Sequence, residues 1–88
     1  MAIKVTPEEL EAMAEDLKKY AGQSTSLASS INRTVTAALN AWEGNAQKDF
    51  AERFNEIFPI LNKNLPDLIN EMARDAEQRA KRYREADA

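Results

Sequence analysis

The 88-residue sequence contains no cysteine and no histidine, and these two absences exclude several kinds of chemistry. Without cysteine there can be no disulfide and no thiolate metal site. Without histidine the chain lacks the commonest general base and the commonest metal ligand. We therefore expect a protein that is not an enzyme, with no catalytic residues, no metal site and no cofactor.

Turn-forming residues are scarce as well. Gly22 and Gly44 are the only glycines, and the three prolines are Pro7, Pro59 and Pro66. With so few glycines and prolines, the sequence favours long helices joined by few turns. It also has no glycine-rich loop that could bind a phosphate. We expect an all-α protein with a single domain over residues 1–88.

Long apolar runs and a strong excess of one charge are also missing. No stretch approaches the roughly 20 apolar residues of a membrane span, and residues 1–6 have no apolar run of signal-peptide length. The net charge is −3, so charge alone does not draw the chain toward nucleic acid. We expect protein partners, and neither nucleic acid nor a small-molecule substrate.

Charged residues gather near the two ends of the chain. The acidic group is Glu8, Glu9, Glu11, Glu15 and Asp16, and the basic group is Arg79, Lys81, Arg82 and Arg84. Each group suits the dipole of its own helix end. Catalytic carboxylate pairs need an enclosing cleft, which a thin helical protein lacks. We assign neither group to a metal, catalytic or nucleic-acid site.

The first helix is predicted over about residues 7–42. Thr6 is a good N-cap, Pro7 fits the first helical position, and Glu9 completes a capping box. Mid-helix Gly22 costs too little to break it. Three rows of residues then repeat every seven positions and predict one broad buried face. The rows are Leu10, Leu17, Ser24, Ile31, Ala38; Met13, Tyr20, Leu27, Thr34, Ala41; and Ala14, Ala21, Ala28, Val35, Trp42.

A turn at 43–45 should separate this helix from a second one over about 46–85. Gly44 suits a left-handed residue that closes a helix, and Asn45 can cap the next. Because the turn is tight, the two helices should run antiparallel. The second helix keeps its apolar face on both sides of Pro59 and Pro66, so we expect kinks there, with a complete break as the alternative.

The two helices would form a thin rod, each with a face wider than one partner helix can cover. This favours pairing of two hairpins into a four-helix bundle. Between residues 21 and 41 the only charge is Arg33, which is typical of an interface; the alternative is an exposed helix covered by small polar residues. The candidate dimer-interface residues are Leu17, Ala21, Leu27, Ala28, Ile31 and Val35.

Two features carry the question of function. Trp42 could seal the open end of the hairpin, or it could stay partly exposed at the turn as a recognition anchor. Tyr83 and Asp87 stand four positions apart and so share one helix face. A carboxylate at a helix C-terminus is locally unfavourable, which hints that Asp87 serves a function rather than the fold.

Together, the Trp42-Glu43-Gly44 turn between two long helices and the Tyr83-x-x-x-Asp87 tail resemble the WXG family. These are the small ESAT-6-like proteins exported by the type VII (ESX-like) secretion systems of actinobacteria and Firmicutes. The resemblance covers essentially the whole chain. Pro59 and Pro66 are not part of the family pattern.

The resemblance implies an antiparallel hairpin that dimerises into a four-helix bundle. Trp42 and Gly44 would match the turn motif, and Tyr83 and Asp87 the C-terminal export motif. In the family, the turn of one subunit lies near the C-terminal motif of its partner, and a membrane-bound ATPase of the secretion system reads the two together. A secreted homodimer is the leading expectation. Alternatives are an adaptor that pairs with a related chain or a larger helical toxin and is exported with it, and a cytoplasmic structural hairpin.

Overall fold

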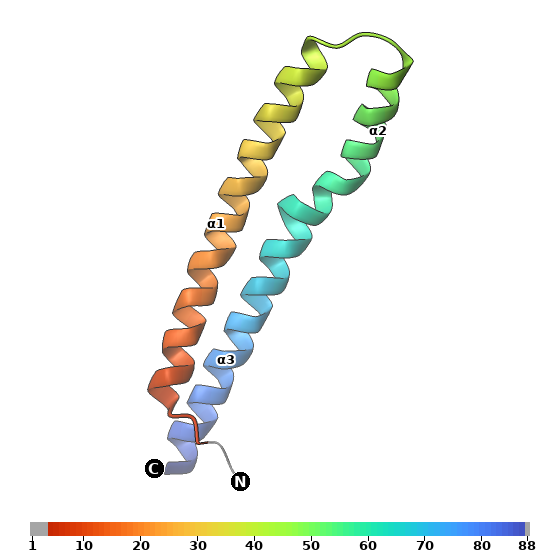
Figure 1. Ribbon diagram of the computed structural model, residues 1–88. Coiled ribbons are helices and arrows are strands. Elements are labelled where there is room, and N and C mark those ends of the chain that lie inside the picture. The colour runs from red at the N-terminus through yellow and green to blue at the C-terminus, as the bar shows by residue number, and fades with distance from the viewer. Residues whose placement is uncertain (1–3, 88) are drawn as a thin grey trace.

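The computed structural model describes residues 4–87, apart from the side chain of Asp87. The chain forms an elongated antiparallel hairpin (Figure 1), with principal extents of 66 × 22 × 17 Å. One limb is α1 (Pro7–Asn40). The other is a continuous succession of α2 (Asn45–Pro59), the π-helix η1 (Ile60–Asn64) and α3 (Leu65–Asp87). The expected all-α hairpin is confirmed.

The start of α1 has the expected cap. The Thr6 hydroxyl accepts a hydrogen bond from the Glu9 backbone N–H at 3.1 Å and donates one to the Glu9 carboxylate at 3.1 Å. Pro7 occupies the first helical position, where the missing N–H costs nothing. The predicted cap at Thr6 and the place of Pro7 are therefore confirmed, and they explain why the helix begins where it does. The expected capping box is incomplete, because the Glu9 carboxylate meets the Thr6 hydroxyl and not the Thr6 backbone N–H.

The end of α1 lies at Asn40, two residues before the expected boundary. The N–H groups of Ala41 and Trp42 donate to Ala38 and Leu39, each only three residues earlier. Such bonds tighten the last turn and satisfy carbonyls that a helix end leaves free. Trp42 therefore belongs to the connection between the helices and not to the helix.

Gly44 makes the bend. Its φ of 107° and ψ of −178° lie in a region that essentially only glycine adopts. The expectation that Gly44 closes the first helix in the left-handed helical conformation is wrong, because Ala41 is the C-cap of α1. Gly44 is also the N-cap residue of α2, so the expectation that Asn45 caps this helix is wrong: Asn45 is already helical. The cap is weak because glycine offers no side-chain acceptor. Instead the Gln47 amide donates to the Leu39 carbonyl at 3.2 Å and ties the two helix ends together.

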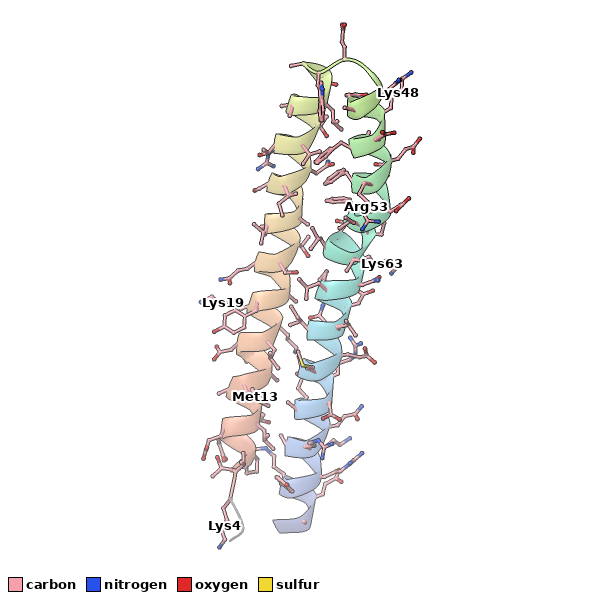
Figure 2. All side chains as sticks on the ribbon, turned by 45° about the vertical axis from the view of Figure 1, so that its right-hand side comes forward. Lys4, Met13, Lys19, Lys48, Arg53 and Lys63 are labelled. Carbon is pink, nitrogen blue, oxygen red and sulfur yellow. The ribbon has the colours of Figure 1, made fainter. Side chains whose placement is uncertain are left out.

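The core of the hairpin is built from alanine. Apart from Pro66, the buried residues of the described chain are alanines of α1 and α3, each at most 3% exposed: Ala14, Ala21, Ala28, Ala73, Ala76 and Ala80. Small side chains let two helix backbones approach closely, so the alanine row of the first helix meets an alanine row of the second. Charged side chains such as Lys19, Lys48 and Lys63 project away from the opposite limb (Figure 2).

The π-helix corrects the register of the second limb. Its inward positions step back by seven from Ala80 to Ala73 and Pro66, then by eight to Phe58 and by seven to Ala51. In a regular α-helix an extra residue would turn the inward face by about 100°. A π-turn absorbs that residue: the Leu65 N–H bonds to the Ile60 carbonyl, five residues earlier. The helix thus continues past both prolines, with a shift of its axis that Figure 1 shows.

The three seven-residue rows of α1 do not form one buried face. The row of Ala14, Ala21 and Ala28 is buried, and the row of Leu10, Leu17 and Ile31 is half-buried. The row of Met13, Tyr20 and Leu27 is exposed, at 47%, 52% and 61%. One opposing helix covers only two rows, so the third faces outward along the hairpin.

Candidate recognition surfaces

Trp42 stands at the turn, 40% exposed. Its ring centroid lies 5.9 Å from that of Phe50, with the two planes at 48°. This tilted pair lies in the distance range of favourable aromatic contacts. Neither of the two interpretations of Trp42 holds fully. Its ring packs on Phe50, but it is not buried in a core, because Phe50 is itself half exposed. The pair forms an aromatic surface at the tip of the hairpin.

Tyr83 lies in the last turns of α3 and is half exposed. It follows Ala80, the last buried residue among the described side chains. Asp87 is the last residue of α3, and its side chain lies outside the described residues. Positions 83 and 87 are therefore one helical turn apart, as expected from the sequence.

The hairpin does not bring Trp42 and Tyr83 together. Arg84, the neighbour of Tyr83, reaches Glu11 near the start of α1. Trp42 follows the end of α1, about 30 residues further on, which corresponds to about 45 Å along the helix at 1.5 Å per residue. The two motif residues thus lie at opposite ends of the hairpin, Trp42 near the turn and Tyr83 near the termini (Figure 1).

Ion pairs between the limbs close the end near the termini. Lys18 Nζ lies 2.7 Å from Glu77 Oε2, and the Arg84 guanidinium contacts Glu11 and Glu8. Hydrogen bonding from Arg84 lowers the pKa of the Glu11 carboxyl, and hydrogen bonding to Glu77 raises the pKa of Lys18. Sequence reasoning assigned the terminal charges to helix dipoles alone and missed this pairing. The sequence feature that could have revealed it is a matched spacing in an antiparallel hairpin. Glu11 and Lys18 lie seven residues apart on α1, and their partners Arg84 and Glu77 lie seven residues apart on α3.

An open apolar groove of about 910 Å³ runs between α1 and α3 on the same half of the hairpin. Apolar residues of both helices line it, together with a few charged ones. They are Leu10, Met13, Leu17, Leu65, Leu68, Ile69, Met72 and Ala76, with Glu71, Asp75 and Arg79. Met13, Leu68 and Met72 are each about half exposed. The groove therefore continues the exposed row of α1 onto α3.

The six candidate interface residues differ in what they can offer a second chain. Ala21 and Ala28 are already covered within the hairpin. Leu17, Ile31 and Val35 are half-buried, and Leu27 is the most exposed of the set. A contact with another chain would therefore rest on Leu27 and its exposed neighbours in the row, with Leu17 supplying one wall of the groove.

No metal-binding geometry emerges from the described side chains: they contain no group of three or more acidic residues placed to hold an ion. No helix in residues 4–87 combines the length and apolar character that a membrane crossing requires.

A slender antiparallel hairpin with Trp-x-Gly at its turn defines a class of small helical proteins. Residues 2–88 match the WXG100 family, described as proteins of 100 residues with WXG. The chain belongs to this family and is ESAT-6-like. Protein YukE of Bacillus subtilis strain 168 is 30% identical over 78 residues, which span 89% of this chain and 79% of YukE.

Two solved structures share the fold. EsxA of Geobacillus thermodenitrificans, in crystal form I, superposes with a TM-score of 0.81 at 24% identity, over 98% of this chain and 92% of EsxA. EsxB of Bacillus anthracis strain Sterne, described as a secreted protein, gives 0.82 at 25% identity, over 100% of this chain and 99% of EsxB. The hairpin is thus the architecture of known Esx proteins.

Proposed function

We propose that this chain is a non-enzymatic ESAT-6-like substrate of a type VII secretion system, exported as a folded homodimer. Its signal is composite: the Trp42–Gly44 turn of one subunit and the Tyr83–Asp87 segment of the other. The membrane ATPase of the secretion system reads the two parts together. The observation that carries the proposal is the placement of the two motifs at opposite ends of one hairpin.

The core of a single hairpin is small, and this supports a dimer. Apart from Pro66, its buried residues in the described chain are all alanines, and no larger side chain there is fully buried. A buried methylene contributes about 0.8 kcal/mol, so alanine burial stabilises little, and a chain of this length is near the lower limit for an independent core. A second copy laid on the exposed row and groove would bury Met13, Tyr20, Leu27, Leu68 and Met72.

Antiparallel pairing of two hairpins would join the motifs. When two rods of equal length lie side by side in opposite directions, the turn of each meets the terminal end of the other. Trp42 of one subunit then approaches Tyr83 of its partner, although the two residues of one chain stay about 45 Å apart along α1. An ATPase that needs both motifs for recognition would bind the assembled dimer and not a lone chain. That requirement couples export to folding.

Export of the relative supports the rest of the proposal. EsxB of Bacillus anthracis is described as a secreted protein, and this chain shares its fold over its whole length. The described helices offer no membrane crossing, and the half-exposed Trp42 and Tyr83 are available to a protein reader. Trp and Tyr, together with Arg, are enriched at binding hot spots.

Secretion of two variants tests the signal. Trp42→Ala and Tyr83→Ala are expected to keep their helical circular dichroism and to disappear from the culture supernatant, as followed by immunoblotting against whole cells. Glu43→Gln and Arg82→Gln are the matched controls, since each changes an exposed neighbour of a motif residue. Normal export of both alanine variants would refute the signal. Absence of the unaltered protein from the supernatant would instead favour a cytoplasmic structural hairpin.

Sedimentation of the purified protein tests the dimer. We expect a dimer at micromolar concentration, and Leu27→Glu should shift it toward monomer by placing a charge in the interface. Lys19→Glu is the control, because Lys19 projects away from the opposite limb (Figure 2). A stable folded monomer would contradict the homodimer. Its conversion to a complex by the product of a neighbouring gene would establish the alternative, an adaptor paired with a helical toxin.

A further inference from the structure

Arg84 lies inside the Tyr83–Asp87 segment, and all three nitrogens of its guanidinium contact carboxylates of α1, the other limb. Nε donates to Glu11 Oε2 at 3.3 Å, and Nη2 donates to Glu11 Oε1 at 2.5 Å. Nη1 lies 3.5 Å from Glu8 Oε1. Two parallel bonds to one carboxylate are the geometry that arginine makes and lysine does not. The segment is therefore tied to α1 by a specific contact.

The contact lies where the chain has little else to hold it. Ala80 is the last buried residue among the described side chains of α3, and residues 81–86 are all exposed. Helix ends held by few buried contacts fray. Arg84 near a helix C-terminus and Glu8 and Glu11 near a helix N-terminus each also suit the local dipole. The side chains are about half exposed or more, so the contact adds little to global stability. Its effect is local order.

We propose that Arg84 is a positioning residue that holds the Tyr83–Asp87 segment helical against α1, so that the segment is ordered before its reader binds. A reader that meets an ordered helix does not have to offset the entropy of ordering it. This inference rests on the proposed function, because it assigns Arg84 a role in presenting the same signal.

Variants on both limbs separate positioning from direct recognition. Arg84→Gln and Glu11→Gln each remove the contact, one within the segment and one on α1, far from it in sequence. Arg84→Lys keeps the charge without the two parallel bonds. Arg82→Gln is the matched control, since none of the ion pairs among the described side chains involves Arg82. The readouts are amide hydrogen exchange of residues 81–87 and the exported fraction, with overall circular dichroism as the check on folding.

We expect Arg84→Gln and Glu11→Gln to speed exchange in residues 81–87 by several-fold and to lower export by a similar factor. Arg84→Lys should fall between these variants and the unaltered protein, and Arg82→Gln should match the latter. The reversed pair, Arg84→Glu with Glu11→Arg, should recover part of both losses, which no purely structural role of either residue alone would give.

Other outcomes overturn the inference. Loss of export with Arg84→Gln but not with Glu11→Gln, and without rescue by the reversed pair, would mean that the reader contacts Arg84 directly. If both variants are exported normally while Tyr83→Ala stays inside the cell, the positioning role is refuted and the proposed signal stands. Normal export of Tyr83→Ala would refute the proposed signal itself. The hydrogen-exchange readout is independent of export: unchanged amide exchange of residues 81–87 in Arg84→Gln would show that the contact does not order the segment.

Discussion

The two halves of the hairpin are held by different means. We call the part where α1 packs on α3 the base half, and the part where α1 faces η1 and α2 the tip half. The base half contains all six buried alanines and the cross-limb ion pairs of Lys18 and Arg84. In the tip half α2 has no buried residue, and Phe54 and Phe58 pack on each other, with ring centroids 5.2 Å apart.

This difference teaches how one pair of helices serves two purposes. Alanine contacts bring the backbones together and fix the register of the base half. The inward side chains of the tip half include the larger, half-buried Phe54 and Phe58, and Figure 1 shows the limbs diverging toward the turn. The π-helix lies at the junction and lets each half keep its own contacts. We expect the base half to carry most of the stability and to present Tyr83–Asp87, while the tip half presents the Trp42–Gly44 part of the proposed signal.

Deleting one residue should have the largest effect, and its place should decide the result. Deletion of exposed Arg74 rotates the following residues by about 100° and moves Ala76 and Ala80 away from α1. Deletion of Lys63 removes the extra residue of the π-helix and keeps both halves aligned. We expect the first deletion to abolish cooperative thermal unfolding and the second to lower the Tm only, because Pro66 then crowds a regular turn.

Circular dichroism melts at equal protomer concentration check this pair, since a dimer's Tm depends on concentration. Equal loss of stability in the two deletions would contradict the assignment of the π-helix as the element that absorbs an inserted residue.

Enlarging an inward alanine should come next. Ala73→Leu forces a large side chain between closely packed backbones of the base half, and overpacking of this kind costs about 1–3 kcal/mol. Ala51→Leu places the same side chain at a half-buried position of the tip half, where the limbs leave more room, and should cost clearly less. Urea denaturation measures both free energies of unfolding. A larger loss for Ala51→Leu would reverse the comparison.

The two glycines should respond in opposite directions. An added Cβ meets nothing within 4 Å at either position, so the backbone alone decides. Gly44→Ala forces an alanine into a glycine-only conformation and should destabilise the turn by about 1–3 kcal/mol. Gly22→Ala, in the middle of α1, should stabilise the protein by up to about 1 kcal/mol. Thermal melts of the two variants give the sign directly, and a shared sign would be evidence against the observed turn geometry.

The smallest effect concerns pH. Arg84 lowers the pKa of Glu11 in the folded protein, so the pair stabilises the fold above the ordinary carboxyl pKa and is lost as the pH falls through the lowered value. The stability difference between the unaltered protein and Glu11→Gln should therefore stay constant from neutral pH down to the ordinary carboxyl pKa and shrink between that pKa and the lowered one. Glu56→Gln, which removes only a pair within α2, is the tip-half control. A difference that stays constant with pH would exclude this contribution.

Local signals in the sequence were sufficient for most of the fold. The cap at Thr6 and the bend at Gly44 depend on neighbouring residues, so they could be read directly. The family followed from the turn and the tail. Each of these features is decided by residue type over a few positions.

What could not be predicted depends on the relation between the limbs. Whether the row of Met13, Tyr20 and Leu27 is buried depends on how many helices are present, and one chain supplies only one partner helix. The contact of Arg84 with Glu11 requires the antiparallel register. The π-helix is visible in the sequence only as an eight-residue step between Pro66 and Phe58, which has meaning once the inward face is known.

The most direct test of the composite signal uses two defective chains together. Trp42→Ala and Tyr83→Ala should each be retained when produced alone. A mixed antiparallel dimer of the two contains one intact pair, with Trp42 from one subunit and Tyr83 from the other, so co-production of differently tagged chains should return both to the supernatant. Export of neither chain, with the mixed dimer demonstrated in the cell extract, would contradict a signal shared between subunits.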